Sequence, residues 1–120
     1  MSAFSRARIP DITLIQWTRA RDLFERKGER IEPSQLRSAA GMHLDTAYSL
    51  ILGLFQEQLA DLYLLVFHTC EESNVAVRSY MDGFQPVPWL CPVCEEQVTD
   101  GAALNYELRA VLRAPVEFVD

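Results

Sequence analysis

Two short cysteine motifs constrain this chain more than any other feature. Cys91-Pro-Val-Cys94 forms a C-x-x-C pair, and the segment His68-Thr-Cys70 precedes it, with twenty residues between Cys70 and Cys91. Two ligand pairs separated by a loop are the arrangement with which a tetrahedral Zn²⁺ joins two distant stretches of backbone. The sequence therefore predicts a structural zinc site whose ligands are His68, Cys70, Cys91 and Cys94.

The fourth ligand has alternatives. Thiolates supply negative charge and an imidazole completes a closed tetrahedron, so His68 is the first choice. Glu95, Glu72 or His43 would supply a carboxylate or an imidazole in its place. Without a metal, Cys70 would be a small buried apolar residue, as free cysteines often are.

The segment Trp89-Leu-Cys91-Pro-Val-Cys94 also resembles the redox pair of thioredoxins, in which a helix N-terminus lowers the pKa of the first thiol. Such pairs follow the first strand of a βαβ unit, whereas this pair lies late in the chain. A catalytic zinc would need a general base, and the sequence contains no His-x-Glu motif. We therefore expect a protein that is not an enzyme.

Length and charge limit the class of protein. The 120 residues, 49% of them apolar, suit one domain over residues 1–120. Apolar runs of about 18 residues and a secretory signal are both missing, which predicts a cytoplasmic protein without membrane contact. Residues 1–40 carry eight Arg and Lys against five acids, and residues 41–120 carry three against twelve. The acidic part should repel polyanions.

Three helices are predicted in the first half of the chain. The first covers residues 11–27, starting after Pro10 and stopping at Gly28. The second is short, starts at Pro33 and ends at Gly41. The third starts at His43 or Asp45, and its apolar residues recur at helical spacing. These residues are Leu44, Ala47, Tyr48, Ile51, Leu54, Phe55 and Leu59.

The second half is predicted to consist of strands. Residues 62–70 are almost all aliphatic, aromatic or β-branched, which predicts a strand. Residues 75–80, 106–112 and 116–119 are expected to form three shorter strands, the last two separated at Pro115. Alternation along the first strand places five residues on one face. They are Leu62, Leu64, Val66, His68 and Cys70.

The order of helix, short helix, glycine-containing turn, longer helix and β-hairpin resembles a winged helix-turn-helix domain. Residues 33–54 carry the resemblance, with Ala39-Ala40-Gly41-Met42 at the turn. The Cys-Pro-x-Cys motif resembles the knuckle of a zinc ribbon, although Glu95 stands where such ribbons often have glycine. The resemblance implies an α+β fold. Its winged-helix-like core would span residues 10–70, and the wing and a zinc-knuckle β extension would span residues 71–120.

A winged helix implies DNA binding, but the recognition helix argues against it. Residues 42–77 contain no Arg or Lys, and phosphate neutralisation supplies much of the affinity for DNA. A DNA-binding transcriptional regulator therefore remains an alternative. In that alternative the contacts would come from Arg19, Arg21, Arg37, Thr46 and Ser49.

The third helix has more apolar residues than one face can hold. Leu50, Ile51 and Leu52 are consecutive, and a stripe about 100° wide cannot hide all three. The helix is either buried on two sides or docks another chain or a second copy. The predicted partner-binding residues are Tyr48, Leu50, Leu52 and Phe55. We therefore predict a non-catalytic interaction or adaptor subunit of a multiprotein complex, with a small thiol redox protein as a third hypothesis.

Overall fold

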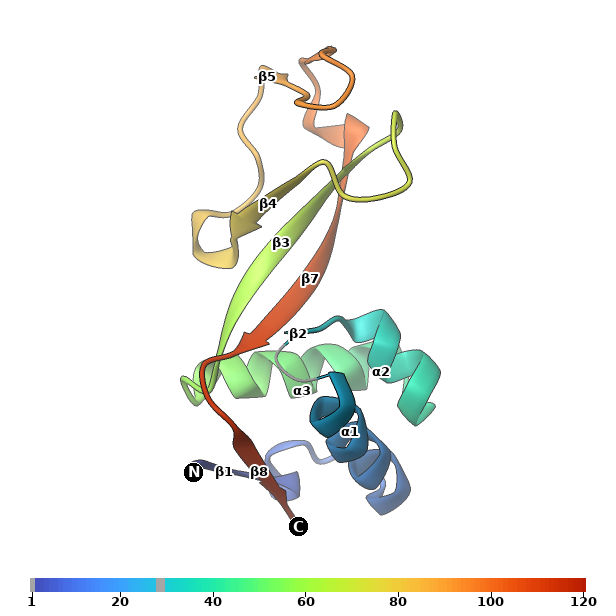
Figure 1. The fold of residues 1–120 in the computed structure, drawn as a ribbon, viewed down its shortest axis with the longest axis vertical. Helices are drawn as coiled ribbons and strands as arrows, with labels where there is room; N and C mark the ends of the chain where they lie inside the picture. Colours follow the sequence, from blue (N-terminus) through green and yellow to red (C-terminus); the bar gives the residue numbers. More distant parts are fainter. Residues whose placement is uncertain (1, 28–29) are drawn as a thin grey trace. The chain divides into compact units, whose positions relative to one another are not determined.

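The computed structural model describes residues 2–27 and 30–120 (Figure 1). It contains three helices in the first half, with strands dominating after them, which confirms the predicted α+β class. The chain divides into two compact units: Met1–Asp61 with Ala110–Asp120, and Leu62–Arg109. Gly28, the predicted stop of the first helix, lies outside the described residues.

Side-chain caps decide where the first two helices begin. Helix α1 (Leu14–Lys27) starts three residues later than predicted, because Thr13 and Gln16 cap it reciprocally: each side-chain oxygen accepts the other's backbone N–H at 3.1 Å. Helix α2 (Pro33–Ala40) has a capping box at its start and ends at Gly41, whose φ of 68° is left-handed. The prediction for α2 is confirmed.

Helix α3 (Leu44–Gln56) ends earlier than its apolar pattern predicted. Gln58 adopts a left-handed φ of 62°, and the N–H of Leu59 donates to the carbonyl of Leu54 at 2.9 Å. These features form a Schellman motif, which closes the helix before Leu59. The prediction that Leu59 lies on the helix is therefore wrong.

Aromatic side chains form much of the core of the first unit. Strands β1 (Ser2–Ser5) and β8 (Val116–Val119) pair in parallel and bring Phe4 and Phe118 to α1 (Figure 1). The Phe118 ring lies 5.5 Å from Trp17 and 4.8 Å from Phe24, measured between ring centroids. Helix α3 approaches closely, because a Cβ at Gly53 would lie 2.9 Å from the Phe4 ring.

The end of the chain belongs to the first unit. The short strand β2 (Arg30–Ile31) pairs antiparallel with the last part of β7 (Leu104–Leu112). The Arg113 N–H donates to the carbonyl of Leu59 at 3.0 Å, and its guanidinium pairs with Asp61 at 2.8 Å. Residues 110–120, which the sequence grouped with the zinc extension, are thus held by the helical unit. The prediction of one domain stays a prediction.

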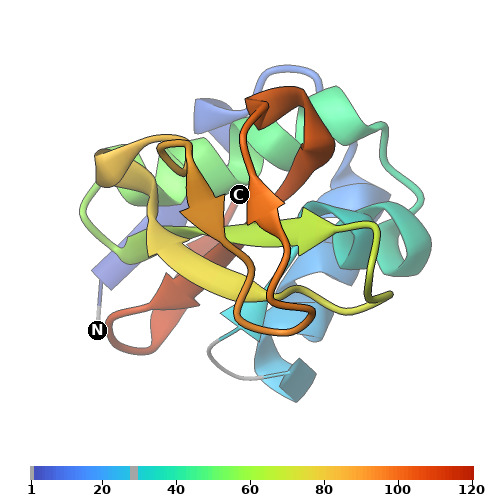
Figure 2. The same cartoon turned by 90° about the horizontal axis from the view of Figure 1, so that it is seen from above.

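Strands make up the second unit. In the four-stranded sheet the order is β2-β7-β3-β4, and β4 (Ala76–Ser79) pairs antiparallel with β3 (Ala60–His68). Strands β5 (Trp89–Leu90) and β6 (Gln97–Val98) form a separate hairpin, drawn in orange tones in Figure 2. Of the residues predicted to share one face of β3, those within the strand are buried. Cys70, by contrast, is exposed and lies in the turn beyond the strand.

None of the helices in the described part of the chain has both the length and the apolar character needed to cross a membrane.

Candidate metal centre

Two turns of the second unit present the predicted zinc ligands. His68 is the last residue of β3, and Cys70 lies in the following turn, where the N–H of Glu71 donates to the carbonyl of His68 at 3.2 Å. Cys91 follows β5, and Cys94 ends the turn before β6. Four residues from distant parts of the sequence are thereby brought to one place.

The four donor atoms lie close together, and two of the pairs have the spacing of a tetrahedral zinc site. All four lie within 4.8 Å of one another. The Cys70 and Cys91 Sγ atoms are 3.7 Å apart, and Cys94 Sγ lies 3.5 Å from His68 Nδ1. With Zn–S bonds of about 2.3 Å and Zn–N bonds of about 2.0 Å, a tetrahedron places two sulfurs about 3.8 Å apart and a sulfur and a nitrogen about 3.5 Å apart. The three cysteines and the histidine can therefore hold a metal ion such as zinc.

The alternative fourth ligands do not belong to this group of donors. Among the described residues, the group consists of His68 and the three cysteines, without Glu95, Glu72 or His43. Glu95 instead has a backbone role. Its φ of 62° is left-handed, and its N–H donates to the carbonyl of Cys91 at 2.9 Å. A glutamate thus adopts the conformation for which ribbon knuckles often use glycine.

The thiols differ in how easily they ionise. Desolvation acts to raise the pKa of Cys91, but hydrogen bonds from the backbone N–H groups of Cys94 and Val93 and from the Cys70 and Cys94 thiols together lower the pKa to about 7. Desolvation and hydrogen bonds to the Cys94 and Cys91 thiols raise the pKa of Cys70 to about 12. The turn therefore stabilises one thiolate, and the crowding of three sulfurs opposes a second. A bound dication removes that opposition.

Glu96 also belongs to this site, although the sequence analysis did not name it among the candidate site residues. The Nε2 atom of His68 lies 3.5 Å from Glu96 Oε2, on the opposite side of the ring from Nδ1. His68 is buried, whereas the Glu96 side chain is 66% exposed. A carboxylate in this position accepts the second ring N–H of a metal-binding histidine and selects the tautomer. The only signal in the sequence was a carboxylate two residues after Cys94.

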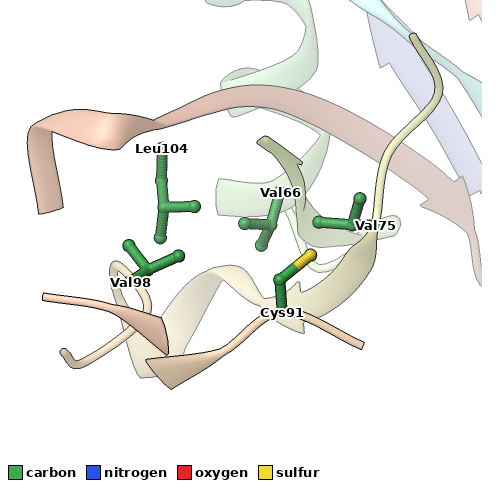
Figure 3. Close-up of a cluster of buried hydrophobic side chains, with 5 residues drawn as sticks. All are labelled: Val66, Val75, Cys91, Val98 and Leu104. Atoms are coloured by element: carbon green, nitrogen blue, oxygen red, sulfur yellow. The ribbon is translucent and has the colours of Figure 1, made fainter. Parts of the chain in front are cut away.

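A small apolar cluster supports the knuckle. Figure 3 shows the side chains of Val66, Val75, Cys91, Val98 and Leu104 converging, and all five are buried. Trp89 and Tyr106 pack against this cluster and are partly buried. Cys91 thus has two roles, because its side chain is both a donor and part of the core. Five side chains are a small core, so a metal clasp would add much to the stability of this unit.

The predicted interface residues of α3 have different environments. Leu50 is fully buried in the first unit, so the prediction that it contacts a partner is corrected: it packs in the core with Ile51 and Leu54. Tyr48, Leu52 and Phe55 are half-buried. Leu50 is therefore part of the core, whereas Tyr48, Leu52 and Phe55 keep part of their surface exposed and Leu44 of the same helix is 37% exposed.

The residues named for DNA contact lie in the first unit. Arg19, Arg37 and Ser49 are exposed, and Arg21 and Thr46 are half-buried. The Ser49 hydroxyl donates to the carbonyl of Asp45 at 2.9 Å, within its own helix. The exposed residues of α3 include Asp45 and neither Arg nor Lys, so this helix has no positive charge to pair with DNA phosphates.

Comparison of the chain with family models, with curated proteins and with solved structures finds no match. Function is therefore argued from the site itself.

Proposed function

We propose that this protein is a non-catalytic interaction module, an adaptor subunit of a cytoplasmic multiprotein complex, whose second unit is held together by a structural zinc ion. The observation that carries the proposal is the set of three cysteines and one histidine, whose donor atoms lie within 4.8 Å of one another and include two pairs at tetrahedral spacing. Four protein donors fill the coordination sphere of zinc and leave no position for water or substrate. Such a site stabilises a surface and performs no reaction.

The order of elements supports a winged-helix arrangement. Helices α1, α2 and α3 are followed by β3, and the sheet order places β7 between β2 and β3. In a winged helix, β2 would be the short strand after the first helix, and β3 and β7 would be the two strands of the wing. The zinc-binding segment would then be an insertion between the two strands of the wing. The sequence analysis had instead placed it after the wing, as a C-terminal extension.

The turn after Cys91 speaks against the redox alternative. A thioredoxin-like pair relies on a helix N-terminus to stabilise its first thiolate. Here the described residues after Cys91 form a turn and then β6, without a helix. The two neighbouring donors, Cys70 and His68, are better explained by a metal.

We expect the purified protein to contain about one zinc ion per chain, because closed zinc sites bind with free energies on the order of 10 kcal/mol or more. The zinc should be lost as the pH is lowered stepwise below about 7, the pKa of the Cys91 thiol, because protons then compete with the metal for the thiolates. Elemental analysis after dialysis at each pH measures the content. A metal-free preparation with fully ordered strands would contradict the proposal.

Affinity for duplex DNA is expected to be micromolar or weaker at about 150 mM salt, because an acidic chain neutralises few phosphates. Fluorescence anisotropy with a pool of random duplexes measures this affinity. A nanomolar complex with one selected sequence would instead support the transcriptional regulator.

A further inference from the structure

Two of the exposed apolar side chains of the second unit, Met81 and Phe84, lie three residues apart in the sequence and line the same hollow. Met81 is 74% exposed and Phe84 is 71% exposed. Both belong to the segment after β4, which consists of the short helix η2 (Tyr80–Asp82) and the turn at Gly83. Together with Leu64 of β3 they line a hollow of about 360 Å³. Apolar surface of this kind on one loop is typical of a contact site.

The loop is held in place by its own polar contacts. The Arg78 guanidinium donates to the carbonyls of Gly83 and Asp82 at 3.0 and 3.3 Å and to Gln85 Oε1 at 3.1 Å. Beneath it, the Phe84 ring centroid lies 4.6 Å from that of Tyr106. The backbone of the loop and the Phe84 ring are therefore held before any partner binds, which lowers the entropic cost of association.

The neighbouring strand is the edge of its sheet. In the order β2-β7-β3-β4, strand β4 has a sheet neighbour on one side. Edge strands present backbone N–H and C=O groups with which an extended segment can pair. Val77 adds a half-exposed apolar side chain to this edge. Strand and loop together thus offer main-chain hydrogen bonds beside an apolar surface.

The net negative charge of the second unit indicates which class of partner would bind it. Residues Leu62–Arg109 contain seven acids and two arginines, and Arg78 is already engaged by the loop. Asp82 is exposed between Met81 and Phe84. A basic partner complements this surface, whereas a second copy would set one acidic unit against another.

We propose that Met81, Phe84 and the edge of β4, which we name the β4 platform, dock an extended segment of a partner protein that carries large apolar side chains flanked by Lys or Arg. This inference rests on the proposed interaction function and specifies its surface and partner class. The platform belongs to the second unit, whereas the sequence had placed the interface on α3, a helix of the first unit.

The test is selection of a random twelve-residue peptide library, displayed on phage, on the zinc-loaded full chain. We expect the selected peptides to combine apolar residues with Lys or Arg. The strongest peptide is then measured by fluorescence anisotropy. Met81→Ser/Phe84→Ser should weaken it at least about tenfold, because a few central apolar contacts carry most of the binding energy of an interface. Ile15→Ser, which changes an equally exposed apolar residue of α1, should leave the affinity unchanged.

Three results would overturn the proposal. Unchanged binding by the double variant would mean that charge attraction alone recruits the peptide. Selection of acidic peptides, or of none, would exclude a basic partner segment. A wild-type dimer that the double variant converts to a monomer in light scattering would make a second copy the occupant. Zinc content measured on the same samples separates these results from a failure of the zinc clasp.

Discussion

Replacing Cys91 by serine is expected to reduce the zinc content from about one ion per chain to near zero and to unfold the second unit. The closed site loses a thiolate, and binding free energy on the order of 10 kcal/mol no longer supports the fold. The five-residue cluster around Val66 is too small to replace it. We expect the helical circular dichroism of the first unit to persist while the fluorescence of the partly buried Trp89 shifts to the red.

Two further variants separate the metal from the packing. Cys94 is exposed and lies outside the apolar cluster, so Cys94→Ser removes a donor without disturbing the core. It should lose zinc and loosen the strands as Cys91→Ser does. Glu96→Gln keeps all four donors and should weaken zinc binding about 10–100-fold, as loss of a carboxylate behind a ligating histidine does. If Cys94→Ser retains ordered strands without zinc, the metal is not what holds the second unit together.

Replacing Phe118 by alanine is expected to destabilise the first unit by about 3–5 kcal/mol. This ring is buried and lies between Trp17, Phe24 and Phe4, with centroid distances of 4.8 to 6.2 Å. Removing it leaves a cavity and takes away the contact through which β8 closes the unit. Since domains are stable by about 5–15 kcal/mol, the loss is a large part of the total. Urea unfolding followed by circular dichroism measures it.

Phe84 provides the matched control for this prediction. The same substitution, Phe84→Ala, removes a ring that is 71% exposed and contacts the Tyr106 ring, and should change the free energy of unfolding by no more than about 1.5 kcal/mol. Equal losses for the two variants would mean that Phe84 is buried in solution, which would also remove the basis of the β4 platform. A loss below about 1 kcal/mol for Phe118→Ala would show that the unit does not depend on its aromatic core.

Local signals predicted both ends of α2, but the equally local cap at Thr13 and turn at Gln58 were not predicted. Pro33 and Gly41 delimit α2 as expected, and the strand predicted at residues 116–119 is present. The sequence did not predict the strand pairings that depend on distant segments of the chain. The pairing of β1 with β8 joins the two ends of the chain, and β2 has two residues. A strand of that length has no periodicity to detect, because its extended form comes from the partner strand.

The four residues that can hold a metal ion were predictable, because thiolate and imidazole donors in spaced pairs have few other uses in a chain of this kind. The role of Glu96 could not be predicted from the sequence, because it depends on where the folded turn places the Nε2 atom of His68. The surface of α3 was misjudged for a similar reason. On a helical wheel Leu50 is one apolar residue more than a single buried face can hold. In the folded first unit, however, Leu50 is fully buried, so other parts of the unit cover that side of the helix.

The helix order, the α+β class and the four residues that can hold a metal follow from the sequence alone, because propensities, caps and donor chemistry act over a few residues. The folded structure was needed to show that residues 110–120 belong with the helices, that Glu96 lies beside His68 Nε2 and that Met81 and Phe84 are exposed. These features depend on which distant segments supply hydrogen-bond partners and apolar contacts, and burial is a property of those neighbours and not of the residue itself.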